Sequence, residues 1–125
     1  MLKTKKTLVA ASALAMVMGS LMAPSTASAA DKKAADPIAE GKELAWNRSK
    51  GNCLACHAIA GASMPGNMGP PLVAMKMRYP DKQKLYDVIY DITETRPGVI
   101  MPPFGKHKVL TNEQIEKITD YIYTL

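Results

Sequence analysis

The chain has few aromatic side chains. Its 125 residues include one tryptophan, one phenylalanine and five tyrosines, together 6% of the total. A single small domain buries only a marginal core unaided and often needs an additional stabilising element. Because large side chains are scarce, the composition favours a core that a large apolar cofactor completes.

Long apolar runs are absent after the N-terminal segment. There, three lysines precede the apolar residues 8–22, and Ala27-Ser28-Ala29 fits the small-residue pattern of a signal-peptide cleavage site. The apolar run is short and no stop-transfer pattern follows it, which argues against a retained membrane anchor. We expect residues 1–29 to be a cleaved signal peptide, with cleavage after Ala30 as the alternative, and residues 30–125 to form a periplasmic domain.

An excess of one charge sign is also absent from the expected mature domain. The full chain has a net charge of +5, but its first 29 residues hold three lysines and no acidic residue, so the remaining 96 residues carry about +2. This balance removes the main support for nucleic-acid binding. No internal repeat or change of composition marks a second domain, so we expect one domain that binds no nucleic acid.

Helix signals are clearest at the two ends of this domain. Asp36-Pro37 combines an N-cap with a proline at the first helical position, which predicts a helix through Trp46. Thr111 and Gln114 form a capping box for the last helix. Gly41 costs about 1 kcal/mol relative to alanine inside a helix, so we expect another helix to cross closely there. The residues expected to be buried in the last helix are Ile115, Ile118, Tyr121 and Ile122.

The middle of the domain is predicted to contain long loops and two shorter helices. Glycine and proline are dense in residues 61–71, which marks a loop. Residues 72–77 are expected to form a short helix, and Asp81 to cap a further helix with apolar residues at helical spacing up to Ile92. No segment alternates apolar and polar residues as a strand does. The predicted fold class is therefore all-α, with few helices and long loops.

Both cysteines, Cys53 and Cys56, lie in the stretch Cys-Leu-Ala-Cys-His that ends at His57. A disulfide between them would close a very small loop and stabilise little. Two thiols at this spacing, followed at once by histidine, are an attachment pattern of haem c. In a helical turn the thiols share one face and each reaches a haem vinyl group, while the histidine faces the iron. We predict one covalent haem c, attached at both cysteines and ligated by His57.

Two other kinds of site use the same residue types. A thioredoxin-like dithiol would require a βαβ context, which the sequence lacks. A zinc site would combine Cys53, Cys56 and His57 with His107, but the adjacent Cys56 and His57 fit the usual ligand spacing poorly and no second ligand pair exists. Haem attachment is the favoured interpretation and the dithiol is the main alternative.

The candidates for the second axial ligand are His107, Met64, Met68, Met75, Met77 and Met101. The first two methionines follow His57 so closely that they would have to double back across the haem, and the next two are expected to pack at its edge. Met101 lies 44 residues beyond His57, far enough for the chain to wrap the haem, and two prolines stiffen the loop after it. We predict Met101 as the second ligand, with His107 or an open position as the alternatives.

Residues near these ligands are assigned supporting roles. A ligating histidine usually donates its second N–H to a carbonyl group, and the carbonyl of Gly69 or Pro70 is the candidate acceptor. Pro70 and Leu72 are therefore assigned to the haem pocket, whereas the alternative is a stiff loop over the haem edge. The segment Lys106-His107-Lys108 forms either a docking patch for an acidic redox partner or ordinary solvated surface.

Three longer segments resemble a known family. They are Gly51-Asn-Cys-Leu-Ala-Cys-His57, Met64-Pro-Gly-Asn-Met-Gly-Pro-Pro-Leu72 and Met101-Pro-Pro-Phe-Gly105. Together with Leu110-Thr111 they are similar to SoxX, the small monohaem cytochrome subunit of the SoxAX complex of bacterial thiosulfate oxidation. All c-type cytochromes share the Cys-x-x-Cys-His core, so the other segments carry the resemblance, which covers residues 36–125.

The resemblance implies a class I cytochrome c fold in which the first and last helices cross, with Gly41 and the region of Tyr121 at the crossing. It also implies ligation by His57 and Met101 and a heterodimer with the larger haem subunit, SoxA. In that family the complex joins thiosulfate oxidatively to a cysteine of the carrier complex SoxYZ, and the electrons leave to a downstream cytochrome acceptor.

The residues of this chain suit electron transfer rather than bond formation. Haem attachment consumes both cysteines, and no acid–base cluster is evident, so no catalytic residue is predicted. We expect the chain to relay electrons and not to act as an enzyme alone. A free-standing periplasmic cytochrome c that carries electrons to an oxidase or reductase is the alternative function.

Overall fold

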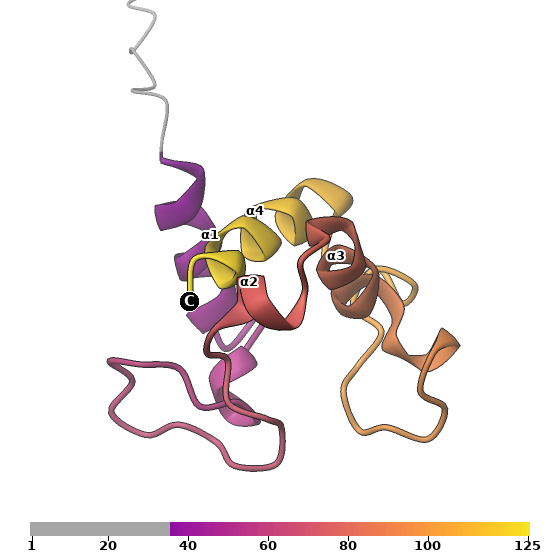
Figure 1. Ribbon diagram of the computed structural model, residues 1–125, viewed down its shortest axis with the longest axis horizontal. Helices are drawn as coiled ribbons and strands as arrows, with labels where there is room; N and C mark the ends of the chain where they lie inside the picture. Colours follow the sequence, from indigo (N-terminus) through magenta and orange to yellow (C-terminus); the bar gives the residue numbers. More distant parts are fainter. Residues whose placement is uncertain (1–35) are drawn as a thin grey trace, which may run out of the picture. The chain divides into compact units, whose positions relative to one another are not determined.

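The computed structural model describes residues 36–125, so the expected signal peptide, residues 1–29, and its cleavage site lie outside the described residues. The elements follow in the order α1 Pro37–Trp46, η1 Cys53–Ala55, α2 Met75–Arg78, α3 Lys82–Asp91, η2 Ile92–Glu94 and α4 Asn112–Tyr123. Residues 36–125 contain no strand, which confirms the all-α class with long loops (Figure 1). In this part of the chain no helix has the length and apolar character needed to cross a membrane.

The two terminal helices begin where the sequence predicts. The Asp36 side chain accepts a hydrogen bond of 3.0 Å from the Ile38 amide at the start of α1. At α4 the Thr111 hydroxyl accepts a bond of 3.2 Å from the Gln114 amide, and the Gln114 side chain accepts one of 3.1 Å from the Thr111 amide. These bonds satisfy amide groups that have no partner inside the helix.

Helices α1 and α4 lie against each other (Figure 1), and Gly41 is a point of close contact between them. A Cβ atom added here would lie 1.9 Å from the Lys117 carbonyl oxygen and 3.0 Å from the Tyr121 Cβ, so only glycine fits. Trp46, at the end of α1, donates a hydrogen bond of 3.1 Å from Nε1 to the Tyr121 hydroxyl. The predicted crossing is confirmed, and close packing offsets the low helix propensity of Gly41.

Helix α2 begins later than predicted. Leu72 lies in an irregular segment, where its amide donates a hydrogen bond of 2.8 Å to the Ala58 carbonyl. Ala74 follows in the left-handed region, with φ of 52°, and a helix cannot continue through that conformation. The helix therefore begins at Met75, whose side chain is buried, and ends at Arg78.

Helix α3 begins after the predicted cap and ends one residue earlier than its apolar pattern. The Asp81 side chain accepts a hydrogen bond of 2.9 Å from the Gln83 amide. At the other end, the Asp91 side chain accepts a bond of 2.9 Å from the Thr93 amide and so caps η2. Ile92 consequently starts a new turn instead of extending α3, although its side chain remains buried.

The core joins α1, α2, α3 and α4. Ala45, Met75, Ile115 and Ile118 are its most deeply buried apolar side chains, each at most 1% exposed. The stripe predicted for α4 is confirmed, because all four of its residues are buried. Several core side chains of α3 and α4 also line a cavity. The predicted haem-binding residues line the same cavity.

Candidate haem-binding site

The two cysteines lie on a short turn that is packed against α1. The Gly51 amide donates a hydrogen bond of 3.0 Å to the Leu44 carbonyl, and Asn52 then adopts the left-handed conformation, with φ of 48°. The 3-10 turn η1 follows from Cys53, and the His57 amide donates a bond of 2.8 Å back to the Cys53 carbonyl. Both thiols are unpaired and partly buried, and the turn places both beside the same cavity.

The imidazole of His57 is held in place by residues 61–71, here called the proline-rich loop. Its Nδ1 lies 2.7 Å from the Pro70 carbonyl oxygen. A Cβ atom added at Gly69 would lie 2.5 Å from Cε1 of the ring, so glycine is needed for this close approach. With Nδ1–H donating to a carbonyl, Nε2 is left as the metal-binding nitrogen.

The same loop is bonded to the cysteine turn by its backbone. The Gly66 amide donates to the Leu54 carbonyl and the Gly69 amide to the Cys56 carbonyl, both at 2.8 Å. A Cβ atom added at Gly66 would lie 2.3 Å from the Ala55 carbonyl oxygen. The turn and the loop therefore form one rigid wall that carries the two thiols and the imidazole.

A cavity of about 880 Å³, here called the central cavity, opens on this wall. Cys53, Cys56, His57, Pro70 and Met101 all line it. Most of the remaining lining side chains are apolar: Leu72, Met75, Leu85, Val88, Ile89, Ile92, Phe104, Leu110, Ile118 and Ile122. The structure thus brings every sequence-predicted site residue to one space.

The central cavity fits a haem. Its lining is mostly apolar, and both thiols and the imidazole lie at one wall. An occupant that suits this cavity is large and apolar and reaches all three groups. A haem with its vinyl groups and iron meets these requirements, and its iron supplies one-electron exchange between the ferric and ferrous states.

The charges around the central cavity are all positive. Arg48, Lys50, Arg78 and Arg96 line it, and no aspartate or glutamate does. Arg78 also donates a hydrogen bond of 2.7 Å to the Pro71 carbonyl, which ties α2 to the proline-rich loop. A haem carries two propionates, and guanidinium groups pair well with carboxylates. Sequence reasoning missed these cations, because they are dispersed along the chain and only folding brings them together.

Among the candidates for the second ligand, Met101 lines the central cavity, whereas His107 does not. Met75 lines it as well, but its sulfur lies 3.6 Å from an Arg78 guanidinium nitrogen within the core. Met68 also lines it, directly before the Gly69 that packs on the His57 ring. The geometry therefore favours Met101 as the thioether that faces His57, and this ligation stays a prediction.

Two other methionines lie outside the central cavity. Met64 is 78% exposed and Met77 is 83% exposed, and neither lines the cavity. The expectation that Met77 packs at the haem edge is therefore wrong for this structure. The two methionines are two residues apart in α2, so they point to nearly opposite sides of the helix, and the buried side chain is Met75.

The two alternative sites gain no support from the geometry. Burial raises the pKa of the Cys53 thiol to about 11, although a backbone hydrogen bond opposes this shift. Such a thiol is protonated at neutral pH and reacts slowly, unlike the low-pKa thiol of a dithiol oxidoreductase. Within residues 36–125, no three histidine, cysteine or acidic side chains are grouped to hold a metal ion.

Comparison with protein families decides the class of the protein. The family model described as cytochrome C oxidase, cbb3-type, subunit III matches residues 36–122. The chain belongs to this cytochrome c family. Membership implies haem c as the cofactor and electron transfer as the role. The matched range includes the cysteine turn, the proline-rich loop and Met101.

Two longer curated proteins are each similar in sequence to this chain over part of their length. The cbb3-type cytochrome c oxidase subunit CcoP of Azospirillum sp. (strain B510) is 36% identical over 109 residues, 74% of this chain. An uncharacterized lipoprotein of Aquifex aeolicus (strain VF5) is 36% identical over 75 residues, 59% of this chain. The alignments cover 36% of each relative, so the chain spans about a third of their length.

A solved structure shares the fold. The crystal structure of SoxXA from P. pantotrophus matches with a TM-score of 0.63 and 24% identity, over 70% of this chain and 80% of that one. This likeness confirms the class I cytochrome c fold. The resemblance to SoxX indicated by the sequence segments therefore holds at the level of the fold.

Proposed function

We propose that residues 30–125 form a periplasmic domain with one haem, released from a signal peptide at residues 1–29. Cys53 and Cys56 would hold the haem through thioether bonds, and His57 and Met101 would ligate its iron. Pro70 orients His57 through its carbonyl oxygen, and Leu72 contributes apolar wall. The observation that supports this assignment is that one apolar cavity collects both thiols, the imidazole and the Met101 side chain.

We further propose that the domain is the electron-transfer subunit of a complex that joins thiosulfate to a carrier-protein cysteine. Its own residues hold, orient and shield the haem. No thiol remains once both cysteines are attached, so bond formation must occur on partner proteins. The proposed partners are a larger SoxA-like haem subunit, a SoxYZ-like thiol-bearing carrier and a downstream cytochrome acceptor. The resemblance of the loop segments to SoxX and the shared fold support this proposal.

The test combines purified components. The holoprotein is mixed with thiosulfate alone, then with a SoxA-like subunit, then with that subunit and the carrier. Haem reduction is followed by absorbance and carrier conjugation by intact mass. We expect thiosulfate-dependent reduction and a heavier carrier only in the complete mixture. Conjugation by this chain alone would contradict the proposal.

A second function has its own support. The family model and the similarity to an oxidase subunit favour a carrier that delivers electrons to an oxidase or reductase. Affinity purification of the tagged chain from periplasm, followed by haem staining of the co-purified proteins, separates the two functions. A stable haem-containing partner that is identified as a SoxA-like subunit favours the thiosulfate complex. Recovery of the chain alone, with rapid oxidation by a terminal oxidase, favours the carrier.

A further inference from the structure

One carboxylate stands apart from the other charged groups. Asp91 is 5% exposed and is the only charged residue in the described part of the chain that is buried. It lies at the end of α3, beside residues that line the central cavity. A buried carboxylate is costly unless it is paired and hydrogen bonded, so its partners indicate what the position does.

Asp91 connects the start of η2 with the loop that follows Met101. Its Oδ1 accepts hydrogen bonds from the amide and the hydroxyl of Thr93, which cap η2. Its Oδ2 accepts a bond of 2.6 Å from the Lys106 ammonium group. The bond from Lys106 is the main cause that holds the pKa of Asp91 below its usual value, so both groups are charged. Lys106 belongs to the loop that begins at Met101.

The backbone makes the same connection. The amides of Gly105 and Lys106 both donate to the Tyr90 carbonyl, at 3.0 and 3.4 Å. A Cβ atom added at Gly105 would lie 2.0 Å from the Tyr90 ring, so the loop packs directly on α3. We call the contacts of Tyr90 and Asp91 with Gly105 and Lys106 the loop anchor.

The other side of Met101 has no such attachment. Within the described residues, positions 97–102 make no hydrogen bond to the rest of the chain. Gly98 has φ of 81°, and Ile100 is 77% exposed. From Met101 to the loop anchor, by contrast, the chain is short and stiff, because Pro102 and Pro103 have fixed φ angles. The position of Met101 is therefore determined from its C-terminal side.

We propose that the Asp91–Lys106 ion pair is a positioning device that keeps the Met101 thioether directed at the haem iron. This inference rests on the proposed ligation by Met101. Lys106 thus has a structural task, in addition to any role of Lys106-His107-Lys108 as a docking patch. Loosening the anchor should allow the loop to move away and expose the iron to other ligands.

The test titrates imidazole into the oxidised holoprotein and follows loss of the red charge-transfer band of methionine–iron ligation. Asp91→Asn keeps an oxygen that can accept the Thr93 bonds but removes the charge, and Lys106→Met removes the ammonium group. We expect each change to raise imidazole affinity about tenfold, the usual scale for a hydrogen bond to a charged group. Lys106→Arg should bind imidazole with near-parental affinity.

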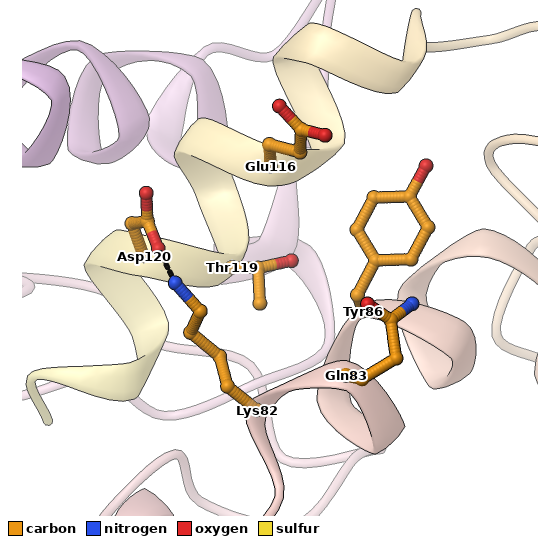
Figure 2. A pocket seen from close by; sticks show the side chains of 6 residues that line it. All are labelled: Lys82, Gln83, Tyr86, Glu116, Thr119 and Asp120. Atoms are coloured by element: carbon orange, nitrogen blue, oxygen red, sulfur yellow. Dashed lines mark hydrogen bonds and ion pairs between the residues drawn. The ribbon is translucent and has the colours of Figure 1, made fainter.

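The chain offers a control ion pair with a more exposed carboxylate (Figure 2). Lys82 in α3 and Asp120 in α4 also form an ion pair of 2.6 Å, and neither lines the central cavity. The two lysine side chains are equally exposed, at 54% for Lys82 and 53% for Lys106. Lys82→Met and Asp120→Asn should therefore leave imidazole affinity within about twofold of the parent, as for distant independent sites.

Three outcomes would overturn the inference. Unchanged imidazole affinity in Asp91→Asn and Lys106→Met would show that the ion pair does not position Met101. An equal rise in the Lys82 and Asp120 variants would show a general loss of stability. Retention of the charge-transfer band in Met101→Leu would contradict the proposed ligation itself. If Met101→Leu loses the band while the anchor variants match the parent, only the positioning role fails.

Discussion

The crossing of α1 and α4 and the walls of the central cavity are built on different principles. At the crossing the chain closes on its own atoms, with Ala45 and Ile115 completely buried and the Gly41 backbone pressed on α4. At the cavity, apolar side chains from α2, α3, α4 and the loops between them face a space of about 880 Å³. The crossing is thus specified by contacts within the chain, which include the Trp46–Tyr121 hydrogen bond, whereas the cavity walls are arranged to suit a cofactor.

This difference explains which segments of the cavity wall are held rigidly. His57, the two thiols and Met101 are each attached to a short rigid segment, and the intervening loops are exposed. Rigid attachment of a ligand lowers the entropic cost of presenting it to the iron. The comparison yields four predictions, given from the largest expected effect to the smallest.

The largest effect is expected from Cys53→Ala/Cys56→Ala. Without thioether bonds the chain should lose its haem, and the apolar cavity lining should lose order because nothing fills the space. Amide hydrogen exchange measured by mass spectrometry should show a strong loss of protection at the hydrogen-bonded amides of residues 58–74 and at those of Gly105 and Lys106. The loss should be smaller in α1 and α4. Equal loss of protection in the cavity loops and in α1 and α4 would contradict the claim that only the cavity walls depend on the haem.

Gly41→Val attacks the crossing instead. The added side chain meets the Lys117 carbonyl, which is backbone and cannot move aside, so we expect a cost of about 3 kcal/mol in the free energy of unfolding. Urea unfolding of the holoprotein, followed by circular dichroism, measures this loss. Ala39→Val, at an exposed position of the same helix, is the control for helix propensity and should cost about 0.5 kcal/mol.

Met101→Leu should change the iron and leave the helices intact. Leucine preserves the apolar volume but offers no ligand, so the red charge-transfer band should disappear and the reduction potential should fall. Spectroelectrochemistry measures both quantities in one titration. His107→Ala is the matched control and should behave as the parent. The ligand assignment is wrong if His107→Ala loses the band and lowers the potential while Met101→Leu behaves as the parent.

The smallest effect is expected from Trp46→Phe at the edge of the crossing. It removes the hydrogen bond from the indole to the Tyr121 hydroxyl, which should cost about 1 kcal/mol of stability. Tyr121→Phe removes the same bond from the other side, so the double variant should cost less than the sum of the two. Strict additivity of the two losses, measured by urea unfolding, would show that this bond does not contribute.

Local sequence signals predicted the helices well. The caps at Asp36 and Thr111 are short-range patterns with a direct physical cause, and the structure contains both. Gly41 was also informative, because a glycine in a helix interior is costly unless something packs against it. The late start of α2 was not predictable, because it depends on the Leu72 bond to Ala58 and the left-handed Ala74.

For the candidate site, the sequence indicated the groups that bind the haem but not those that surround it. The cysteine motif is contiguous, and the prolines after Met101 mark a stiff loop. The cations around the cavity are brought together by folding, and so are Asp91 and Lys106. No local sequence pattern therefore predicts these groupings. Asp91 reads in sequence as an ordinary helix-end acid, and only its burial reveals its role.

The central claim is that one haem is bound covalently at Cys53 and Cys56. Intact-mass measurement under denaturing conditions tests it directly, on the chain produced with the cytochrome c maturation machinery. The account predicts the mass of residues 30–125 plus one haem, and a proteolytic peptide spanning Cys53 to His57 that carries the whole addition. A bare chain, or a peptide containing a Cys53–Cys56 disulfide, would contradict it.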